Sequence, residues 1–354
     1  MTSKIIPNVH AQWHPLKVIM VGKSFAPDYY EPIRDSRVRD NLQIIAKQTE
    51  EDYANFIRVI EQYGAKVIRT DPGYRNIEVD ISNNIDFQCV PLTPMNPRNS
   101  AMVIGNKILI TEKGCAAYEN AIYQNIELQH IINPWSKHTN PDLGTWELDI
   151  YHQFHAPYVT RVGNRLFVDI KDYAWLPDYF IKNLPNYDIV TVDIGGHNDG
   201  SFSPIVPGKL LSVAGESHYA RTFPGWEVMF IKGQWWQGLS QWDKLKNKNN
   251  GKWFIADDNG IDVNDRLIEF IDTWLNNWLG YVEETVFDVN CLVLDRHHIC
   301  FSSYHKEVWD FCKKNNIEPI LTPFRHRYFW DGGLHCITLD IVRDGDMFDF
   351  ETCV

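Results

Sequence analysis

The chain has 354 residues, of which 44% are apolar and 23% charged, and this composition excludes a disordered, collagenous or fibrous protein. Its 34 Lys and Arg residues against 46 Asp and Glu give a formal charge of −12. An acidic chain argues against a nucleic-acid partner, but not against a small anionic substrate in a local pocket. No apolar run approaches the roughly 20 residues that span a bilayer, and the N-terminus shows no secretion signal. We therefore expect a cytoplasmic protein without membrane contact.

The cysteines are scattered along the chain and form no CxxC pair. Because their number is odd, we expect free, buried thiols in a reducing compartment. His297, His298 and Cys300 come nearest to the spacing of zinc ligands, but no matching second pair follows, so we expect no metal site. The cysteines are Cys89, Cys115, Cys291, Cys300, Cys312, Cys336 and Cys353.

Helical periodicity is clear in three parts of the chain. In the first part, apolar residues such as Tyr53, Phe56 and Ile60 recur at helical spacing until Gly64 ends the segment. A short apolar run follows the first and the third helix and predicts a strand at each place. The predicted elements are 40–63 (helix), 66–69 (strand), 264–279 (helix), 304–314 (helix) and 317–321 (strand).

A hairpin pattern recurs along the chain, with two short apolar runs separated by a turn pair. Single strands at 17–21 and 336–341 lie near the two ends and can pair to make a fifth unit. Because helical segments lie between several hairpins, we expect an α/β ring with pseudo-fivefold symmetry, which closes end to end and leaves no open sheet edge. The hairpins are 101–110, 158–168, 202–212 and 291–301, with turns at Gly105-Asn106, Gly163-Asn164, Pro207-Gly208 and Asp295-Arg296.

Polar residues stand just before several of these hairpins. Asn99 precedes the first hairpin, His155 the second, and His197 and Asp199 the third, while Cys336 opens the last strand. In a closed ring, equivalent positions of successive units meet near the axis. We therefore expect these residues to share one pocket.

Cys336, His197 and Asp199 have the side chains of a nucleophilic site. A thiolate is the useful nucleophile, and a nearby imidazolium lowers the pKa of its thiol. Histidine serves as general acid and base near neutral pH, and a carboxylate can hold a planar cation. Each residue also has a structural interpretation, because a lone cysteine is usually a small buried hydrophobe and Gly-Gly-His-Asn-Asp can be only a turn.

Two long motifs resemble the glycine amidinotransferases, a family of guanidino-group-modifying enzymes. These motifs are GGLHCITLDIVRDG at 332–345 and HNDGSFSPIVPGKLLS at 197–212. Two weaker blocks, at 13–22 and 97–108, keep the family's order. The resemblance implies a pentein fold, which is a five-bladed α/β propeller, as a single domain over 1–354. It also implies a homodimer that needs no metal or organic cofactor.

The resemblance further implies a mechanism of amidino transfer between two small molecules, a guanidino donor and an amine acceptor. Cys336 would attack the guanidinium carbon of a donor such as arginine, His197 would protonate the departing amine and later deprotonate the acceptor, and Asp199 would hold the guanidinium. Two alternatives stay open. One is an amidinohydrolase or deiminase, in which water resolves the cysteine adduct. The other is a catalytically weakened pentein that only binds a guanidino compound or a protein.

Three positions depart from the family pattern. His155 stands where the family has an acid that orients the catalytic histidine, so we expect protonated His197 to be less well stabilised and its pH dependence to change. Asn99 replaces a guanidinium-binding acid and would act without charge assistance. Glu216 replaces an arginine that grips a substrate carboxylate, so we expect a more cationic amine or a substrate without a carboxylate there.

Overall fold

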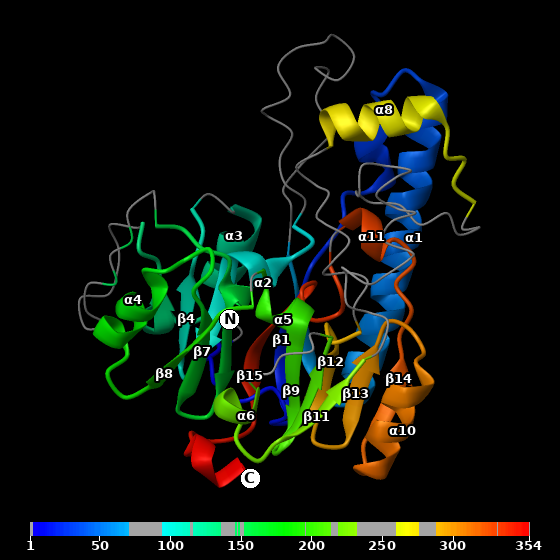
Figure 1. The fold of residues 1–354 in the computed structure, drawn as a ribbon. Helices are drawn as coiled ribbons and strands as arrows, with labels where there is room; N and C mark the ends of the chain where they lie inside the picture. The colour runs from blue at the N-terminus through cyan, green and yellow to red at the C-terminus, as the bar shows by residue number, and fades with distance from the viewer. Residues whose placement is uncertain are drawn as a thin grey trace.

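The computed structural model describes most of the chain and shows five three-stranded sheets within the described ranges. Short helices and helical turns connect the strands, and two longer helical segments rise beyond the sheets (Figure 1). The described residues are 3–70, 94–113, 116–135, 146, 148, 152–194, 196–213, 219–231, 260–275, 288–330 and 332–353.

Four of the sheets share one plan, in which an antiparallel hairpin is extended by a third strand parallel to its second strand. A parallel neighbour needs a crossover connection, and a helix supplies it each time. The four sheets, with their crossover helices, are β3 Ala101–Ile104, β4 Lys107–Ile110 and β5 Ile131–Ile132 (α3 Ala116–Asn125); β6 Val159–Val162, β7 Arg165–Asp169 and β8 Asp188–Val192 (α4 Leu176–Asn183); β9 Phe202–Val206, β10 Lys209–Ser212 and β11 Glu227–Phe230 (α6 Tyr219–Thr222); β12 Leu292–Asp295, β13 His298–Phe301 and β14 Glu318–Leu321 (α10 Lys306–Lys314).

The fifth sheet joins the two ends of the chain. β1 (Leu16–Val21) pairs antiparallel with β15 (Thr338–Arg343) and parallel with β2 (Lys66–Arg69), and the long helix α1 (Ser36–Gln62) is its crossover. The predicted pairing of the terminal strands is therefore confirmed. In Figure 1, β1 and β15 lie near the middle of the molecule, while α1 and α8 (Asp265–Trp274) extend beyond the sheets.

Burial separates the inner strands from the outer ones. β3 and β9 open their sheets and are buried at nearly every position, as near-continuous apolar runs predict. The third strands β8, β11 and β14 are half-buried or exposed at most positions. The leading strands β3 and β9 therefore lie in the interior, whereas the third strands β8, β11 and β14 lie toward the outside.

Several predicted boundaries shift in the structure. The turn of the fourth hairpin is at 296–297, because Asp295 ends β12 and its carboxylate accepts the backbone N–H of His297 at 2.7 Å. This local hydrogen bond is a typical Asx turn. Cys336 does not open the last strand, because β15 begins at Thr338 and Cys336 lies in the turn before it. The end of the helix predicted at 264–279 lies outside the described residues.

A buried ion cluster lies at the centre of the fold. Asp340, in β15, is 1% exposed and receives hydrogen bonds from Arg98, Arg161 and Arg343. Burial alone would raise the pKa of Asp340, but the three guanidinium groups hold it well below its usual range. The carboxylate is therefore ionised and joins three segments of the ring.

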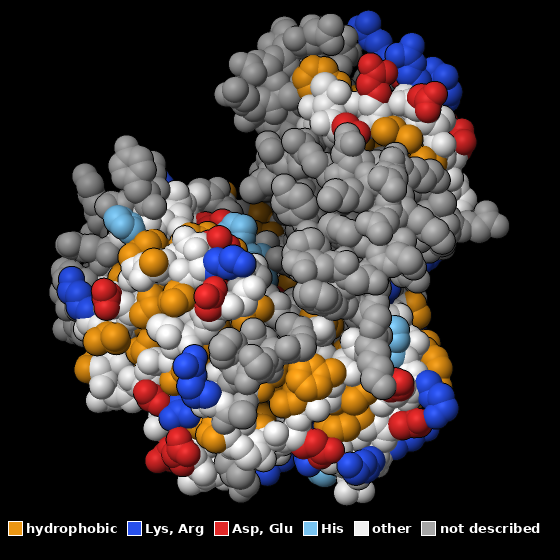
Figure 2. Space-filling model, in the orientation of Figure 1, with side chains coloured by type: hydrophobic (Ala, Val, Ile, Leu, Met, Phe, Trp, Pro, Cys, Tyr) orange, Lys and Arg blue, Asp and Glu red, His pale blue; other side chains and the backbone are white. Residues whose placement is uncertain are grey.

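On one face of the described surface, charged side chains of both signs lie side by side. Figure 2 shows basic and acidic side chains interspersed over one face, both around α8 and along the lower rim. Among the described helices, none combines the length and the apolar character needed to cross a membrane. The five described cysteines are free and buried, as predicted, while Cys89 and Cys115 lie outside the described residues.

Candidate active site

The polar residues that precede the inner strands are positioned by short helical turns. His197 is the N-cap of α5 (Asn198–Ser201), directly before β9, and His155 is the N-cap of a 3-10 helix (Ala156–Tyr158) before β6. Asn99 lies in α2 (Pro97–Ser100), directly before β3. These turns and the turn of Cys336 occupy equivalent places in successive sheets, so the ring gathers them, and α2 and α5 both contact the 3-10 helix Ala156–Tyr158.

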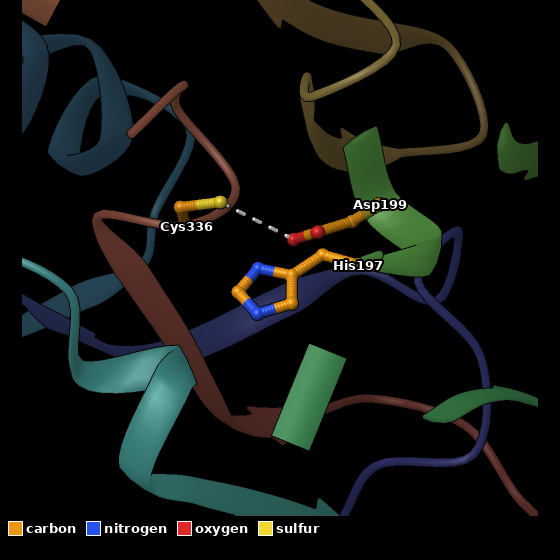
Figure 3. A group of neighbouring side chains, drawn as sticks. All are labelled: His197, Asp199 and Cys336. Carbon is orange, nitrogen blue, oxygen red and sulfur yellow. Dashed lines mark hydrogen bonds between the residues drawn. The ribbon is translucent and has the colours of Figure 1, made fainter. Parts of the chain in front are cut away.

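Cys336, His197 and Asp199 come together as the sequence predicts. Their potential ligand atoms all lie within 4.8 Å of one another, and Cys336 Sγ is 3.5 Å from Asp199 Oδ2. Figure 3 shows the thiol facing the Asp199 carboxylate, with the His197 ring beside both. All three side chains are buried, with exposed fractions of 1%, 6% and 7%. Water is largely excluded here, so each electrostatic interaction is strengthened.

Asn290 fixes the turn that carries the nucleophile. Its Oδ1 accepts the backbone N–H groups of His335 and Cys336 at 3.0 and 3.1 Å, and its Nδ2 donates to Cys336 Sγ at 2.9 Å. A hydrogen bond donated to sulfur favours the charged thiolate over the thiol. Asn290 therefore both holds the backbone of the nucleophile and stabilises its reactive form.

His335 orients the carboxylate of Asp199. Its Nδ1 lies 2.6 Å from Asp199 Oδ2. Burial alone would raise the pKa of Asp199, but the hydrogen bond and charge of His335, with the nearby His197 and Arg98, outweigh burial and lower it. Asp199 is therefore ionised at neutral pH, with one oxygen occupied by His335 and Cys336.

A line of polar side chains leads outward from His197. His155 Nδ1 is 2.9 Å from His197 Nε2, and His155 Nε2 is 2.9 Å from Glu112 Oε1. Ser100 Oγ donates to the other oxygen of Glu112 at 2.7 Å. A carboxylate, that of Glu112, therefore lies directly behind His155, and the expectation that protonated His197 is less well stabilised stays a prediction.

Among the residues that the sequence predicts for the site, two have a buried oxygen atom that receives no hydrogen bond from any described residue. These atoms are Asn99 Oδ1 and Asp199 Oδ1. Buried acceptors without a donor are costly and rare, so they point to a ligand. A guanidinium presents five N–H donors in one plane and can satisfy both kinds of oxygen.

A small cavity adjoins the site. It has a volume of about 40 Å³ and is lined by polar side chains that include Gln12, Arg161, Asp199, Ser203 and His335. The Asp199 carboxylate therefore lies beside both the reactive group and this polar cavity.

Comparison with known proteins bears out the fold and the resemblance to amidinotransferases. No family model matches the chain. It is 21% identical over 376 residues to an L-arginine:L-lysine amidinotransferase of Pseudomonas savastanoi pv. phaseolicola, covering 97% of this chain and 89% of that protein. The structure of SxtG, an amidinotransferase from Microseira wollei in the saxitoxin biosynthetic pathway, matches with a TM-score of 0.61 and 16% identity over 97% of this chain and 99% of that one. Inosamine-phosphate amidinotransferase StrB1 from Streptomyces griseus matches with a TM-score of 0.60 and 15% identity over 98% and 99%.

The chain has the pentein fold. The predicted five-bladed α/β propeller is confirmed, and so is the resemblance to amidinotransferases, which extends over nearly the whole chain. Of the predicted site residues, Glu216 lies outside the described part of this pentein. The expectation that it selects a cationic amine stays a prediction.

Sequence reasoning missed Asn290 and Glu112. Asn290 stands two residues before β12, just as Asn99 stands two residues before β3. The pattern that selected Asn99, a polar residue just before a hairpin, therefore also applies to the fourth hairpin. Glu112 follows its hairpin instead of preceding it. The pairing of Ala101 with Ile110, extended outward by two residues, places Glu112 opposite Asn99.

Cys336, His197 and Asp199 are also side chains that bind zinc. Two of the ligand atoms, however, already have partners in the pentein, because His197 Nε2 meets His155 and Asp199 Oδ2 meets His335. A metal would have to displace one of these partners or bind through the remaining atoms. The arrangement is better suited to a nucleophile with an acid–base group and a cation-binding carboxylate.

Proposed function

We propose that this pentein is an amidinotransferase that moves an amidino group from a guanidino donor to an amine through a covalent intermediate on Cys336. The observation that carries the proposal is the buried group of Cys336, His197 and Asp199, whose reactive atoms lie within 4.8 Å of one another. Arginine is the first donor to consider, since the Pseudomonas relative is named for arginine and lysine. Lysine is a cationic amine, as the expectation for Glu216 requires.

The first half of the reaction loads the enzyme. The guanidinium lies against Asp199 Oδ1 and Asn99 Oδ1, two buried acceptors without a described donor. The Cys336 thiolate attacks the guanidinium carbon and forms a C–S bond. As the C–N bond to the donor breaks, the leaving nitrogen takes a proton from the His197 imidazolium. The donor departs as an amine, and the amidino group stays on sulfur.

The second half returns the enzyme to its starting state. The acceptor enters as a free amine after its ammonium group loses a proton to solvent, where the departed donor amine takes one up. As this amine attacks the amidino carbon, its nitrogen gives a second proton to neutral His197. The new C–N bond forms as the C–S bond breaks, which releases the Cys336 thiolate. One proton leaves His197 and one returns, so the complete cycle consumes no proton.

We further propose that residues 1–354 act as one domain, since strands from both ends of the described chain share one sheet. A homodimer and a cytoplasmic location stay predictions from the sequence. The partners that the site requires are the two small molecules, the donor and the acceptor.

Intact-protein mass spectrometry after incubation with arginine, without an acceptor, tests the proposal. We expect a mass gain of one amidino group in the wild type and none in Cys336→Ala. Cys312→Ala is the matched control, because Cys312 is a buried cysteine of α10 whose pKa burial raises to about 12. It should gain the group as the wild type does. Adding lysine should then discharge the adduct and yield a guanidino product.

Other outcomes would overturn the proposal. Release of urea or ammonia, with no transfer to any amine in a panel, would make the protein a hydrolase or deiminase. Binding of guanidino compounds with neither adduct nor turnover would make it a binding protein. An adduct that persists in Cys336→Ala would assign the nucleophile to another residue.

A further inference from the structure

His197 is connected to a carboxylate through a second imidazole, an arrangement that the sequence does not reveal. His155 lies between them, with 2.9 Å from its Nδ1 to His197 Nε2 and 2.9 Å from its Nε2 to Glu112 Oε1. We propose that Glu112 is a positioning residue for the amidino transfer, which fixes the tautomer of His197 and stabilises its protonated form through His155. The inference rests on the proposed function and adds to it the residue whose negative charge stabilises protonated His197.

The hydrogen-bond chain has one consistent direction. An ionised carboxylate can only accept, so Glu112 accepts from His155 Nε2–H. Neutral His155 then has Nδ1 as its acceptor, which receives His197 Nε2–H. The basic lone pair of neutral His197 is consequently on Nδ1. This is the nitrogen that must take and return the proton of the reacting amines.

Glu112 is held in the state that this role needs. Burial alone would raise its pKa, but the hydrogen bond and charge of His155, the Ser100 hydroxyl and the charge of His197 outweigh burial and lower it. The hydrogen bond from Ser100 Oγ, 2.7 Å long, also fixes the second oxygen. The Glu112 side chain is 23% exposed and lies within the fold rather than on a mobile surface stem.

The position of Glu112 follows from the first hairpin. β3 and β4 pair Ala101 with Ile110, and the pairing continues outward, with the Thr111 N–H donating to the Ser100 carbonyl at 2.9 Å. Glu112 comes next in the chain and lies beside Ser100. Asn99 therefore lies directly before the β3–β4 hairpin, and Glu112 lies directly after it.

Other groups near His197 also influence its protonation. A carboxylate separated from His197 by one imidazole stabilises the imidazolium less than a directly bonded acid does, because the interaction weakens with distance. His155 is 42% exposed at its side chain, so solvent screens part of the effect. Among the described residues, His155, Tyr158, Asp199 and Cys336 lie near His197, while His335 and Arg98 act on the neighbouring Asp199.

The test measures the pKa of His197 by NMR of histidine-labelled protein, without substrate. Glu112→Gln keeps an oxygen acceptor for His155 but removes the charge. We expect it to lower the pKa of His197 by about half a unit to one unit and to slow adduct formation about tenfold. His155→Asp moves a carboxylate into direct contact with His197, since Asp and His share the position of Cγ. We expect it to raise the pKa of His197.

The double variant separates positioning from a merely structural role. In the His155→Asp background, the Glu112 carboxylate is no longer connected to His197 through an imidazole at position 155. Glu112→Gln should therefore change the His197 pKa little. If Glu112 had only a structural role, Glu112→Gln would have the same effect on His197 in both backgrounds. Glu127→Gln is the matched control, because Glu127 and His130 form another His–Glu pair, 4.0 Å apart, in the 3-10 helix just before β5. Loss of this pair should leave His197 unaffected.

The outcomes also distinguish this inference from the proposed function. An unchanged His197 pKa in Glu112→Gln, with normal adduct formation, would overturn the role of Glu112 and leave the transferase intact. A shifted His197 pKa in a protein that forms no adduct with any guanidino donor would support the effect of Glu112 on His197. It would overturn the proposed amidino transfer.

Discussion

Asp199 and Asp340 are two buried carboxylates near the centre of the same ring, and their surroundings differ in kind. Asp340 meets three guanidinium groups and is 1% exposed. Asp199 meets a histidine and a thiol and is 7% exposed. One Asp199 oxygen receives no hydrogen bond from a described residue. Arg98 connects the two, since it bonds Asp340 and the backbone of His335, and its charge lowers the pKa of Asp199.

The difference shows how one residue type serves stability in one place and chemistry in another. A carboxylate whose acceptor positions are filled by fixed cations holds the fold together but cannot receive a ligand. A buried carboxylate with one oxygen that receives no hydrogen bond can bind the N–H groups of a substrate cation. The network of Asp340 therefore supports the backbone on which Asp199, His335 and Cys336 act.

The largest expected effect is on stability and comes from Asp340→Asn. Removal of this charge leaves three buried guanidinium groups without their anion, so we expect a loss of about 3–5 kcal/mol in the free energy of unfolding. Urea denaturation measures it. Asp310→Asn is the control, because Asp310 pairs with Lys306 on the surface and both side chains are well exposed, so its midpoint should not move. Equal midpoints for the two variants would contradict the structural role of Asp340.

Asp199→Asn should have the opposite profile, with a large effect on chemistry. The amide keeps the shape but loses the charge that holds a guanidinium, so we expect adduct formation with arginine to slow by about 100-fold or more. The midpoint of urea unfolding should move less than that of Asp340→Asn. If both variants unfolded equally easily, the division between the two carboxylates would be wrong.

Asn290→Asp tests the polar support of the nucleophile and should have a smaller effect. The change replaces the amide that donates to Cys336 Sγ at 2.9 Å with a carboxylate oxygen, which can only accept and repels a thiolate. We expect alkylation of Cys336 by iodoacetamide at pH 7 to slow by about tenfold. Peptide mapping separates this cysteine from the others. An unchanged rate would show that the thiolate draws its stability from elsewhere.

The smallest expected effect is the change with pH in the stability difference between the wild type and Asp340→Asn. The folded pKa of Asp340 is depressed, so its contribution to stability is present above the unfolded value of about 3.9 and is lost as the pH falls through the folded value. The advantage of the wild type over Asp340→Asn should thus be constant above about pH 5 and shrink below pH 4. Urea midpoints measured from about pH 5 down to about pH 3 follow the trend. A difference that stayed constant to pH 3 would count against the depressed pKa.

The sequence predicts those parts of this pentein that local patterns determine. Turn pairs such as Gly105-Asn106 mark the hairpins, because glycine adopts the positive φ that the turn needs, here 57°. The places of His197 and Asp199 before a hairpin and of Cys336 at the last strand then predict that the three residues meet in a closed ring. The family resemblance assigned roles to these residues that spacing alone left open.

The supporting residues were not predicted, because their roles depend on packing between distant segments. Asn290 reaches Cys336 across 46 positions, and no local pattern distinguishes it from a turn asparagine. Glu112 reaches His197 only through His155, so its relevance depends on where two hairpins face each other. The three arginines of the Asp340 cluster come from three separate strands or turns and show no common motif.

The closure of the ring has a consequence for how the protein becomes active during synthesis. The pairing of β1 with β15 joins the earliest strand to the last one, and Cys336 lies in the turn immediately before β15. On the ribosome, the first four-fifths of the ring can emerge and fold while the nucleophile is still untranslated. The reactive thiol therefore enters its pocket only when the final strand docks, so no incomplete chain carries an assembled site.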